Sequence, residues 1–188
     1  MPLPDLSEVL STRVARFADL DVLEAQKTHD VPQDVLDLIY SRKLMSVISL
    51  EGSTESPISG NAPISGAGGM TITYAQCPPG TGPTLHNHRE TYETFTVMQG
   101  RFEFYLGAKG EESVILDQFD TISVPPGYHR AFTNISEEDG LLQVIITGGV
   151  HDMNDIYFPK ATADKISAKG DDYLDYFKKV RLAFSESE

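Results

Sequence analysis

The sequence predicts a mainly β protein, in which one barrel of short strands lies between helical segments at the two ends. From residue 70 to residue 147, short segments rich in β-branched and aromatic residues alternate with turns rich in Gly and Pro. Near both ends, apolar residues instead recur at helical spacing. No internal repeat is visible. We therefore expect one barrel rather than two.

The N-terminal quarter is expected to be helical. Apolar residues recur at helical spacing over residues 5–20, and a second helix is expected to begin near Pro32 and to end near Arg42. We find no catalytic pattern in this quarter. The predicted organisation is an N-terminal helical extension over 1–45, a β-barrel over 46–149, and a C-terminal loop and helix over 150–188.

The barrel is expected to begin with a strand at residues 46–50. The segment 51–69 is rich in Gly, Ser and Pro and predicts a loop. The clearest alternation lies at 101–106, where Phe102, Phe104 and Leu106 share one face of a strand. The further strands are expected at 71–76, 92–99, 101–106, 113–116, 119–124, 130–135 and 141–147.

After Gly148-Gly149 we expect no further strand. A short helix is predicted over 161–168 and a final helix over 171–184. The final helix carries apolar residues at helical spacing on one face, which we expect to dock on the barrel. These residues are Tyr173, Phe177, Val180 and Phe184.

Composition excludes several classes of function. The 188 residues include 15 basic and 28 acidic side chains, a net charge of -13. An acidic surface repels phosphate groups, so we expect neither nucleic acid nor a membrane as a partner. The single cysteine, Cys77, excludes an internal disulfide. Since no signal peptide or long apolar run is visible, we expect a cytoplasmic protein.

Two histidines stand one residue apart, at His86 and His88. On an extended strand, residues i and i+2 point to the same face. Glu93 follows after a predicted turn, and a returning strand would bring its carboxylate to the same place. Two imidazoles and one carboxylate form the ligand set of a facial triad, which holds a divalent metal and leaves positions open. An exposed histidine pair in a loop is the alternative.

The surrounding glycines complete a longer pattern, G-x5-H-x-H-x4-E-x6-G, from Gly80 to Gly100. A second stretch at 120–134 places Pro125, Gly127 and Asn134 in the order P-x-G-x6-N. Together the two stretches resemble the two signature motifs of the cupin superfamily, over about residues 66–149. The resemblance implies a single cupin jelly-roll β-barrel, with His86, His88 and Glu93 as metal ligands on inward-facing positions. Since this superfamily hosts unrelated chemistries, the resemblance does not identify a reaction.

Two positions depart from the second motif. Phe119 stands where the family has glycine, and Arg130 stands where the family has its third histidine. His129 lies one residue early. In the usual register Arg130 points inward, where it could pair with Glu93 and replace the metal. A bulge after Gly127 would instead turn His129 inward as a fourth ligand.

The leading functional prediction is a metal-dependent enzyme, a dioxygenase-type oxidoreductase acting on a small organic molecule. The metal is expected to be Fe, Mn, Ni, Co or Zn, and Arg130 or His129 would neutralise an anionic substrate or shuttle a proton. A metal-assisted isomerase or epimerase and a non-catalytic ligand-binding protein are the alternatives. Exposed sheet edges suggest a homodimer. The candidate pocket residues are Tyr74, Gln76, Tyr92 and Phe104.

Overall fold

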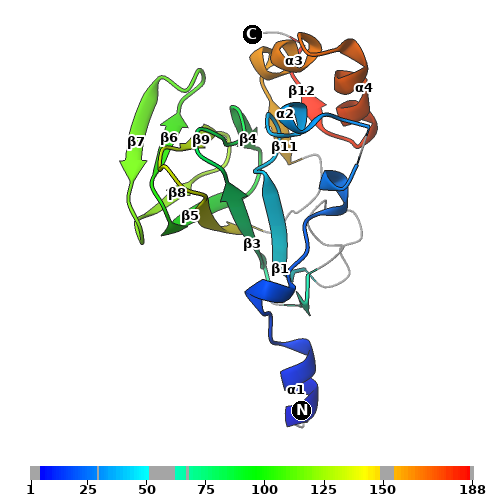
Figure 1. Cartoon of the computed structure of the whole chain (residues 1–188), viewed down its shortest axis with the longest axis vertical. Helices are drawn as coiled ribbons and strands as arrows, with labels where there is room; N and C mark the ends of the chain where they lie inside the picture. Colours follow the sequence, from blue (N-terminus) through cyan, green and yellow to red (C-terminus); the bar gives the residue numbers. More distant parts are fainter. Residues whose placement is uncertain (1–4, 29, 51–61, 67, 149–154, 187–188) are drawn as a thin grey trace.

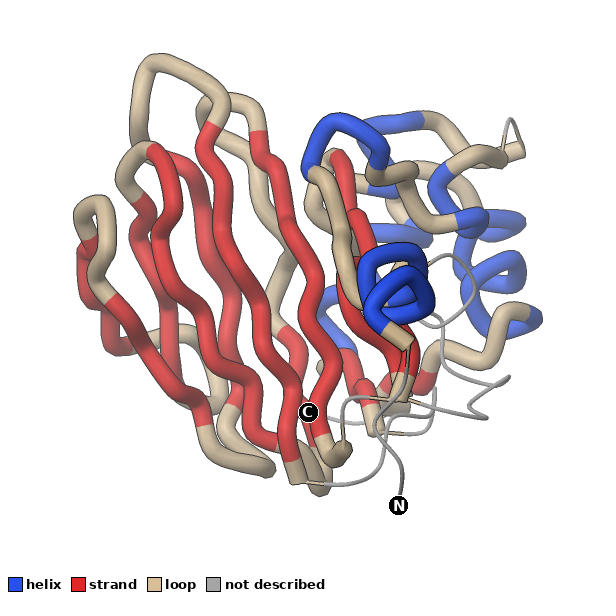
Figure 2. The backbone as a smooth tube through the Cα atoms, turned by 90° about the horizontal axis from the view of Figure 1, so that it is seen from below, coloured by secondary structure: helices blue, strands red, loops and turns tan. Residues whose placement is uncertain are grey.

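The computed structural model describes residues 5–28, 30–50, 62–66, 68–148 and 155–186. Two six-stranded sheets face each other and form a jelly-roll barrel, as the sequence predicts. Figure 1 shows the barrel beside a group of helices, and Figure 2 shows the long strands running side by side. Within the described residues, no helix is both long and apolar enough to cross a membrane.

Each sheet combines strands from distant parts of the chain. The first sheet has the order β2 (Ile64–Ser65), β1 (Lys43–Ser49), β3 (Met70–Cys77), β10 (Gly140–Thr147), β5 (Tyr92–Gln99) and β8 (Thr121–Val124). The second has the order β12 (Ala183–Phe184), β11 (Ile156–Phe158), β4 (His86–His88), β9 (His129–Asn134), β6 (Phe102–Leu106) and β7 (Glu112–Leu116).

The barrel core follows from the alternation of buried and more exposed residues along β3, β5, β9 and β10. In β5, Glu93, Phe95 and Val97 are buried and the residues between them are more exposed. The ring of Phe95 lies 5.1 Å from that of Phe104 and 5.3 Å from that of Phe132, centroid to centroid. These aromatic contacts join the two sheets across the barrel. The core also buries Cys77, which raises the pKa of its thiol to about 11.

Helices lie outside the barrel. They are α1 (Leu6–Thr12), η1 (Phe17–Asp19), η2 (Glu24–Gln26), α2 (Gln33–Leu36), α3 (Lys160–Ser167) and α4 (Asp171–Lys179). The predicted short helix near 161–168 is confirmed by α3. The helix predicted over 5–20 is wrong in its extent, because α1 ends at Thr12 and only the 3-10 turn η1 follows. The helix predicted to end near Arg42 is also too long, since α2 has four residues.

The end of the chain departs most from the prediction. The final helix stops at Lys179 rather than near Phe184, and Arg181 adopts a positive φ of 70° that ends the helical path. The expectation that no strand follows Gly148-Gly149 is wrong. β11 pairs with β4, and β12 pairs with β11, so the C-terminal segment extends the second sheet.

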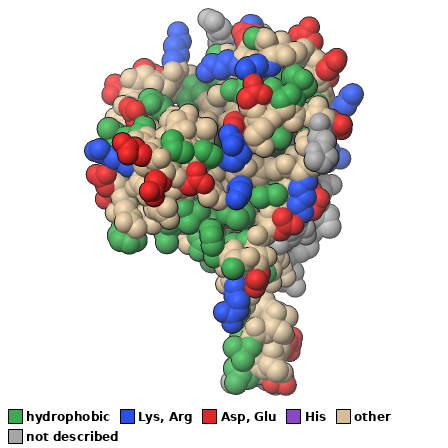
Figure 3. All heavy atoms as spheres, viewed as in Figure 1, with side chains coloured by type: hydrophobic (Ala, Val, Ile, Leu, Met, Phe, Trp, Pro, Cys, Tyr) green, Lys and Arg blue, Asp and Glu red, His purple; other side chains and the backbone are tan. Residues whose placement is uncertain are grey.

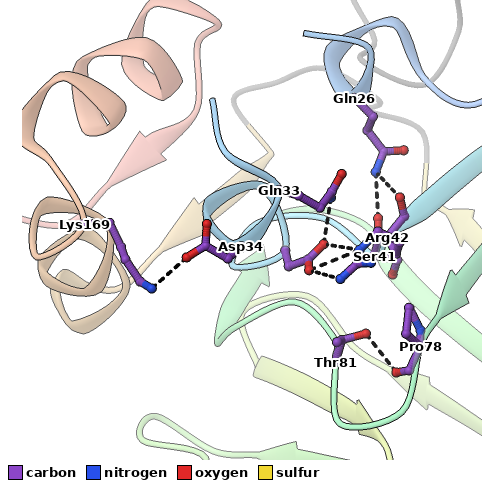
Figure 4. A network of polar contacts seen from close by, with 9 residues as sticks. Gln26, Gln33, Asp34, Ser41, Arg42, Pro78, Thr81 and Lys169 are labelled. Carbon is purple, nitrogen blue, oxygen red and sulfur yellow. Dashed lines mark hydrogen bonds and ion pairs between the residues drawn. The ribbon is translucent and has the colours of Figure 1, made fainter. Parts of the chain in front are cut away.

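These terminal elements form a second apolar cluster beside the barrel, which we call the cap. It contains Val31, Val35, Leu36, Ile39, Phe158, Ile166, Phe177 and Leu182. Polar contacts hold its parts together. Figure 4 shows Asp34 of α2 paired with Lys169 after α3, and Gln26 bound to the carbonyl oxygens of Ser41 and Arg42. The cap thus joins residues from both ends of the chain.

The segment 51–69 was predicted as a loop. Residues 51–61 and 67 lie outside the described part, while Ile64–Ser65 forms the short strand β2 beside β1. The turn before β8 holds Phe119 at a φ of 74°, with 71% of the residue exposed. This left-handed conformation suits glycine, which is the residue expected here from the motif. The chain therefore keeps the geometry of this turn, although Phe119 adopts a left-handed backbone conformation that is unfavourable for a residue with a Cβ.

Candidate metal centre

Three side chains converge at one end of the barrel core. His86 and His88 project from β4, and Glu93 projects from β5 in the opposite sheet. Glu93 Oε2 lies 3.8 Å from His86 Nε2 and 3.5 Å from His88 Nε2. One ligand atom from each residue lies within 4.8 Å of the others, and all three residues are buried. The alternation that predicted this convergence is present in β5, whereas all three residues of β4 are buried.

Hydrogen bonds orient both imidazoles. His86 Nδ1 lies 2.8 Å from the carbonyl oxygen of Thr84, and His88 Nδ1 lies 3.0 Å from a carboxylate oxygen of Asp155. Both partners accept hydrogen bonds, so each Nδ1 carries the hydrogen. In its neutral form, each ring keeps a lone pair on Nε2, the nitrogen that faces Glu93. Burial lowers the pKa of His86, which favours this neutral form.

Asp155 is the functional residue that the sequence did not identify. One of its carboxylate oxygens accepts from the backbone N–H of Glu90 over 2.7 Å, and the other accepts from Thr91 Oγ1 and His88 Nδ1. Burial would raise the pKa of Asp155, but these hydrogen bonds lower it to about 2. Asp155 lies outside both motifs, just before a three-residue strand, so no sequence signal pointed to it.

Arg130 occupies the fourth place around the cluster. In the pairing of β4 with β9 it stands opposite His86, and its Nε lies 3.2 Å from Glu93 Oε2. The side chain is fully buried. Neither Glu93 Oε2 nor the three guanidinium nitrogens make a hydrogen bond, so the contact is a pairing of charges only. Burial would raise the pKa of Glu93, but the imidazoles and Arg130 lower it to about 2.

His129 does not join the cluster, and its prediction as a fourth ligand is wrong. It stands opposite Asn87 in the register of β4 and β9, on the other face of the sheet. Its Nε2 lies 3.0 Å from Asn87 Nδ2. The burial pattern of β9 alternates without interruption, with Arg130, Phe132 and Asn134 buried. No bulge therefore turns His129 inward, and a proton-transfer role for it at this site has no geometric support.

The sequence of the barrel matches a known family. Residues 73–146 match the family model described as "Cupin domain". This segment is a cupin domain. The match includes His86, His88, Glu93 and Arg130, while Asp155 and the cap lie beyond it.

Several solved structures are similar to part of the chain at low sequence identity. An uncharacterized conserved protein with a double-stranded β-helix domain from Klebsiella pneumoniae is 20% identical, with a TM-score of 0.41 over 44% of this chain and 70% of its own. The cupin domain of Schizosaccharomyces pombe Cnp3 is 14% identical, with a TM-score of 0.42 over 56% and 64%. A predicted oxalate decarboxylase from Thermotoga maritima is 19% identical, with a TM-score of 0.38 over 41% and 64%. The last two alignments thus span less than two thirds of the neighbour. No curated protein matches the chain.

A cavity opens beside the ligand cluster, between the core of the cupin domain and the cap. Its volume is about 90 Å³. Phe95, Phe132, Val144 and Ile146 line it from the barrel, and both terminal segments line it from the cap side. The cap-side residues include Leu23, Ile39, Tyr40, Ile156, Phe158 and Leu182.

The predicted pocket residues are not among those that line this cavity. Thr73 and Ala75 point inward from β3, so the strand period turns Tyr74 and Gln76 to the outer face. For the same reason Glu93 points inward while Tyr92 is about half exposed. Phe104 is buried in the barrel core, behind Phe95 and Phe132. All four residues therefore lie away from the wall of this cavity.

The cluster of this cupin domain fits a divalent transition metal. Ligand atoms at about 2.1 Å from a tetrahedral ion lie about 3.4 Å apart, close to the 3.5 and 3.8 Å separations observed. The imidazole lone pairs face the buried oxygen of Glu93, which makes no hydrogen bond. The hydrogen bond from His88 to Asp155 is the carboxylate–histidine contact that supports metal ligands. The guanidinium of Arg130, which lies 3.2 Å from Glu93, opposes a cation here.

Proposed function

We propose that His86, His88 and Glu93 bind a divalent transition metal, and that the protein is a dioxygenase-type oxidoreductase acting on a small organic molecule. The convergence of two Nε2 lone pairs on an oxygen without a hydrogen bond carries this proposal. Fe, Mn, Ni, Co and Zn all accept mixed imidazole and carboxylate ligands. With three protein ligands, such a metal would offer open positions to oxygen or substrate and would supply Lewis acidity and redox chemistry.

The chain's own residues have separate roles in this proposal. Thr84 and Asp155 hold the two imidazoles in the tautomer with a free Nε2. Glu93 contributes a negative charge that stays ionised, because its pKa is lowered to about 2. Arg130 holds that carboxylate in place through its charge and acts as a positioning residue. The apolar wall of the cavity excludes water from the reacting groups.

Two alternatives use the same site. A metal-assisted isomerase or epimerase would need the same ligands without oxygen. A non-catalytic ligand-binding protein is favoured by Arg130, which stands at the third-histidine position and pairs with Glu93. The pairing also weakens this alternative, because Glu93 already neutralises Arg130 and leaves no net positive charge for an anionic ligand.

Metal content of the purified protein tests the proposal. We expect near-stoichiometric metal in the wild-type chain, after reconstitution if needed, and its loss in His86→Ala/His88→Ala. His129→Ala is the matched control, since it removes a histidine on the neighbouring strand outside the cluster, and it should keep the metal. Failure to load Fe(II), Mn(II), Ni(II), Co(II) and Zn(II) in turn would overturn the proposal.

Oxygen uptake then separates the two kinds of enzyme. The Fe(II)-loaded protein is incubated with candidate small acids and carbonyl compounds while dissolved oxygen and product are followed together. A dioxygenase consumes oxygen in step with product. Turnover without oxygen consumption would support the isomerase instead.

A further inference from the structure

The wall of the cavity beside the metal ligands is almost entirely apolar. Of its residues, twelve are hydrophobic, three are the ligand cluster, and the others are Tyr40, Ser41 and Thr73. The hydroxyl groups of these three contribute little, since almost all of the surface that the wall presents is carbon. None of the described residues that line the cavity is Lys or Arg. We infer that the cavity selects a small hydrophobic molecule with a single anionic group, such as a short branched monocarboxylate. This inference rests on the proposed metal site.

The volume limits the size of the ligand. At about 15 Å³ for each water-sized atom, a cavity of about 90 Å³ holds a ligand of about six non-hydrogen atoms. The walls come from tightly packed aromatic and branched side chains of both clusters, which leave little room for expansion. Sugars and sugar phosphates are too large for this space.

The polarity of the wall limits the ligand further. A hydroxyl group or a second carboxylate placed against Phe95, Phe132 or Val144 would lose its hydrogen bonds to water and gain none from the side chains there. A methyl group at the same place would gain favourable contacts. The wall therefore discriminates between ligands of equal size by the polarity of the end that points away from the cluster.

The charges at the cluster determine how many anionic groups can enter. The cluster brings together two carboxylates, Glu93 and Asp155, and one guanidinium, Arg130, which lies 3.2 Å from Glu93. This leaves one negative charge, which repels an anion. A divalent ion at His86, His88 and Glu93 would leave one positive charge, and one carboxylate or enolate would neutralise it. A dianion would bring a second charge with no partner.

Four probes of nearly equal size test these limits in protein-observed NMR titrations. Isobutyrate is the preferred ligand, lactate replaces one of its methyl groups by a hydroxyl, isobutyramide removes its charge, and malonate adds a second carboxylate. With the Zn(II)-loaded protein, which is redox-inert, we expect isobutyrate to bind at least tenfold more tightly than each of the others. Equal or tighter binding of lactate or malonate would overturn the inference.

The metal-free protein separates this inference from the proposed function. In the metal-free protein, the affinities of isobutyrate and isobutyramide should reverse. Isobutyramide should bind more tightly than isobutyrate, because the cluster then carries a net negative charge. Lactamide should bind more weakly than isobutyramide in either form. If Zn(II) fails to load while isobutyramide still binds in preference to lactamide, the metal proposal fails and the apolar selectivity stands.

Two variants on β10 test whether the preference for isobutyrate over lactate arises in this cavity. Val144→Thr adds a hydroxyl to the cavity wall and should narrow the difference between isobutyrate and lactate by several fold. Ile145→Thr makes a related change on the outer face of β10 and should leave the difference unchanged. Thermal unfolding checks that both variants fold. Equal effects of the two variants would place the ligand outside this cavity. If Val144→Thr does not fold, the titrations of the wild-type protein with the four probes still test the inference.

Discussion

The Asp155 carboxylate accepts a hydrogen bond from His88 Nδ1 over 3.0 Å, although 67 residues separate the two in the sequence. Asp155→Asn should lower metal affinity by about 10- to 100-fold, because the amide supports the imidazole less well. Competition with a chromophoric chelator measures this affinity. Asp155→Glu should recover part of it, and Asp164→Asn, at an exposed carboxylate of α3, should change nothing. An unchanged affinity in Asp155→Asn would show that this contact does not support the metal.

Arg130 should limit the affinity for metal, because its guanidinium lies against Glu93. Arg130→His removes a buried cation and restores the histidine that the second cupin motif has at this position. We expect metal affinity to rise at least tenfold. The metal-free variant should lose about 3 kcal/mol of stability, since Glu93 then stays buried without its ionic partner.

Calorimetric unfolding with and without metal measures both effects, and Arg130→Lys serves as the control because it keeps the charge. A fall in metal affinity in Arg130→His would contradict the view that Arg130 opposes the cation.

Phe119 holds a left-handed backbone conformation at a φ of 74° and is largely exposed. Phe119→Gly should raise the free energy of unfolding by about 1 kcal/mol, because glycine adopts this conformation without a clash of its Cβ. The melting temperature should rise by about 2–4 °C. Phe119→Ala keeps the Cβ and removes the ring, so it should give no gain. Equal stabilisation by Ala and Gly would trace the effect to the ring instead.

The N-terminal arm, by which we mean the helix α1 (Leu6–Thr12), should mediate formation of a homodimer. Figures 1 and 3 show it projecting from the body with apolar side chains near its end. None of the residues of α1 is buried, and Leu6 and Leu10 are 70% and 61% exposed. An isolated helix of seven residues has little stability of its own. The apolar face of this arm would gain stability by packing on a second copy of the chain.

Sedimentation velocity should therefore show a dimer that Leu6→Glu/Leu10→Glu dissociates. The control Ser7→Glu/Ser11→Glu adds the same charge beside the apolar face and should leave the dimer intact. A monomeric wild-type protein at micromolar concentration would contradict this prediction.

The sequence was sufficient for the ligand cluster because local periodicity determines it. His86 and His88 share a strand face, and the alternation of β5 points Glu93 inward. The same rule places Arg130 inward, once the register with β4 is known. That register depends on pairing between distant strands, so the sequence left His129 and Arg130 as alternatives.

Other parts of the site depend on tertiary contacts that leave no local pattern. β11 has three residues, too few for an alternation to be visible, and its position is determined by pairing with β4. Asp155 acquires its role only through that pairing. The sequence also did not show that the cap closes the barrel on the side of Phe158 and Leu182, so the residues that line the cavity from that side were not predicted.

The hydrogen bond between His88 and Asp155 also determines which fragment of the protein can retain the metal site. The segment that matches the family, residues 73–146, includes every proposed metal ligand but excludes Asp155 and eight of the eighteen residues that line the cavity. It also excludes β1, which pairs with β3, and β11, which pairs with β4. A fragment cut at those boundaries would expose the edges of β3 and β4, and its cavity would lack the side that the cap provides. Engineers who want to transplant this metal site should therefore move the whole chain, because the recognisable module is not a self-sufficient unit.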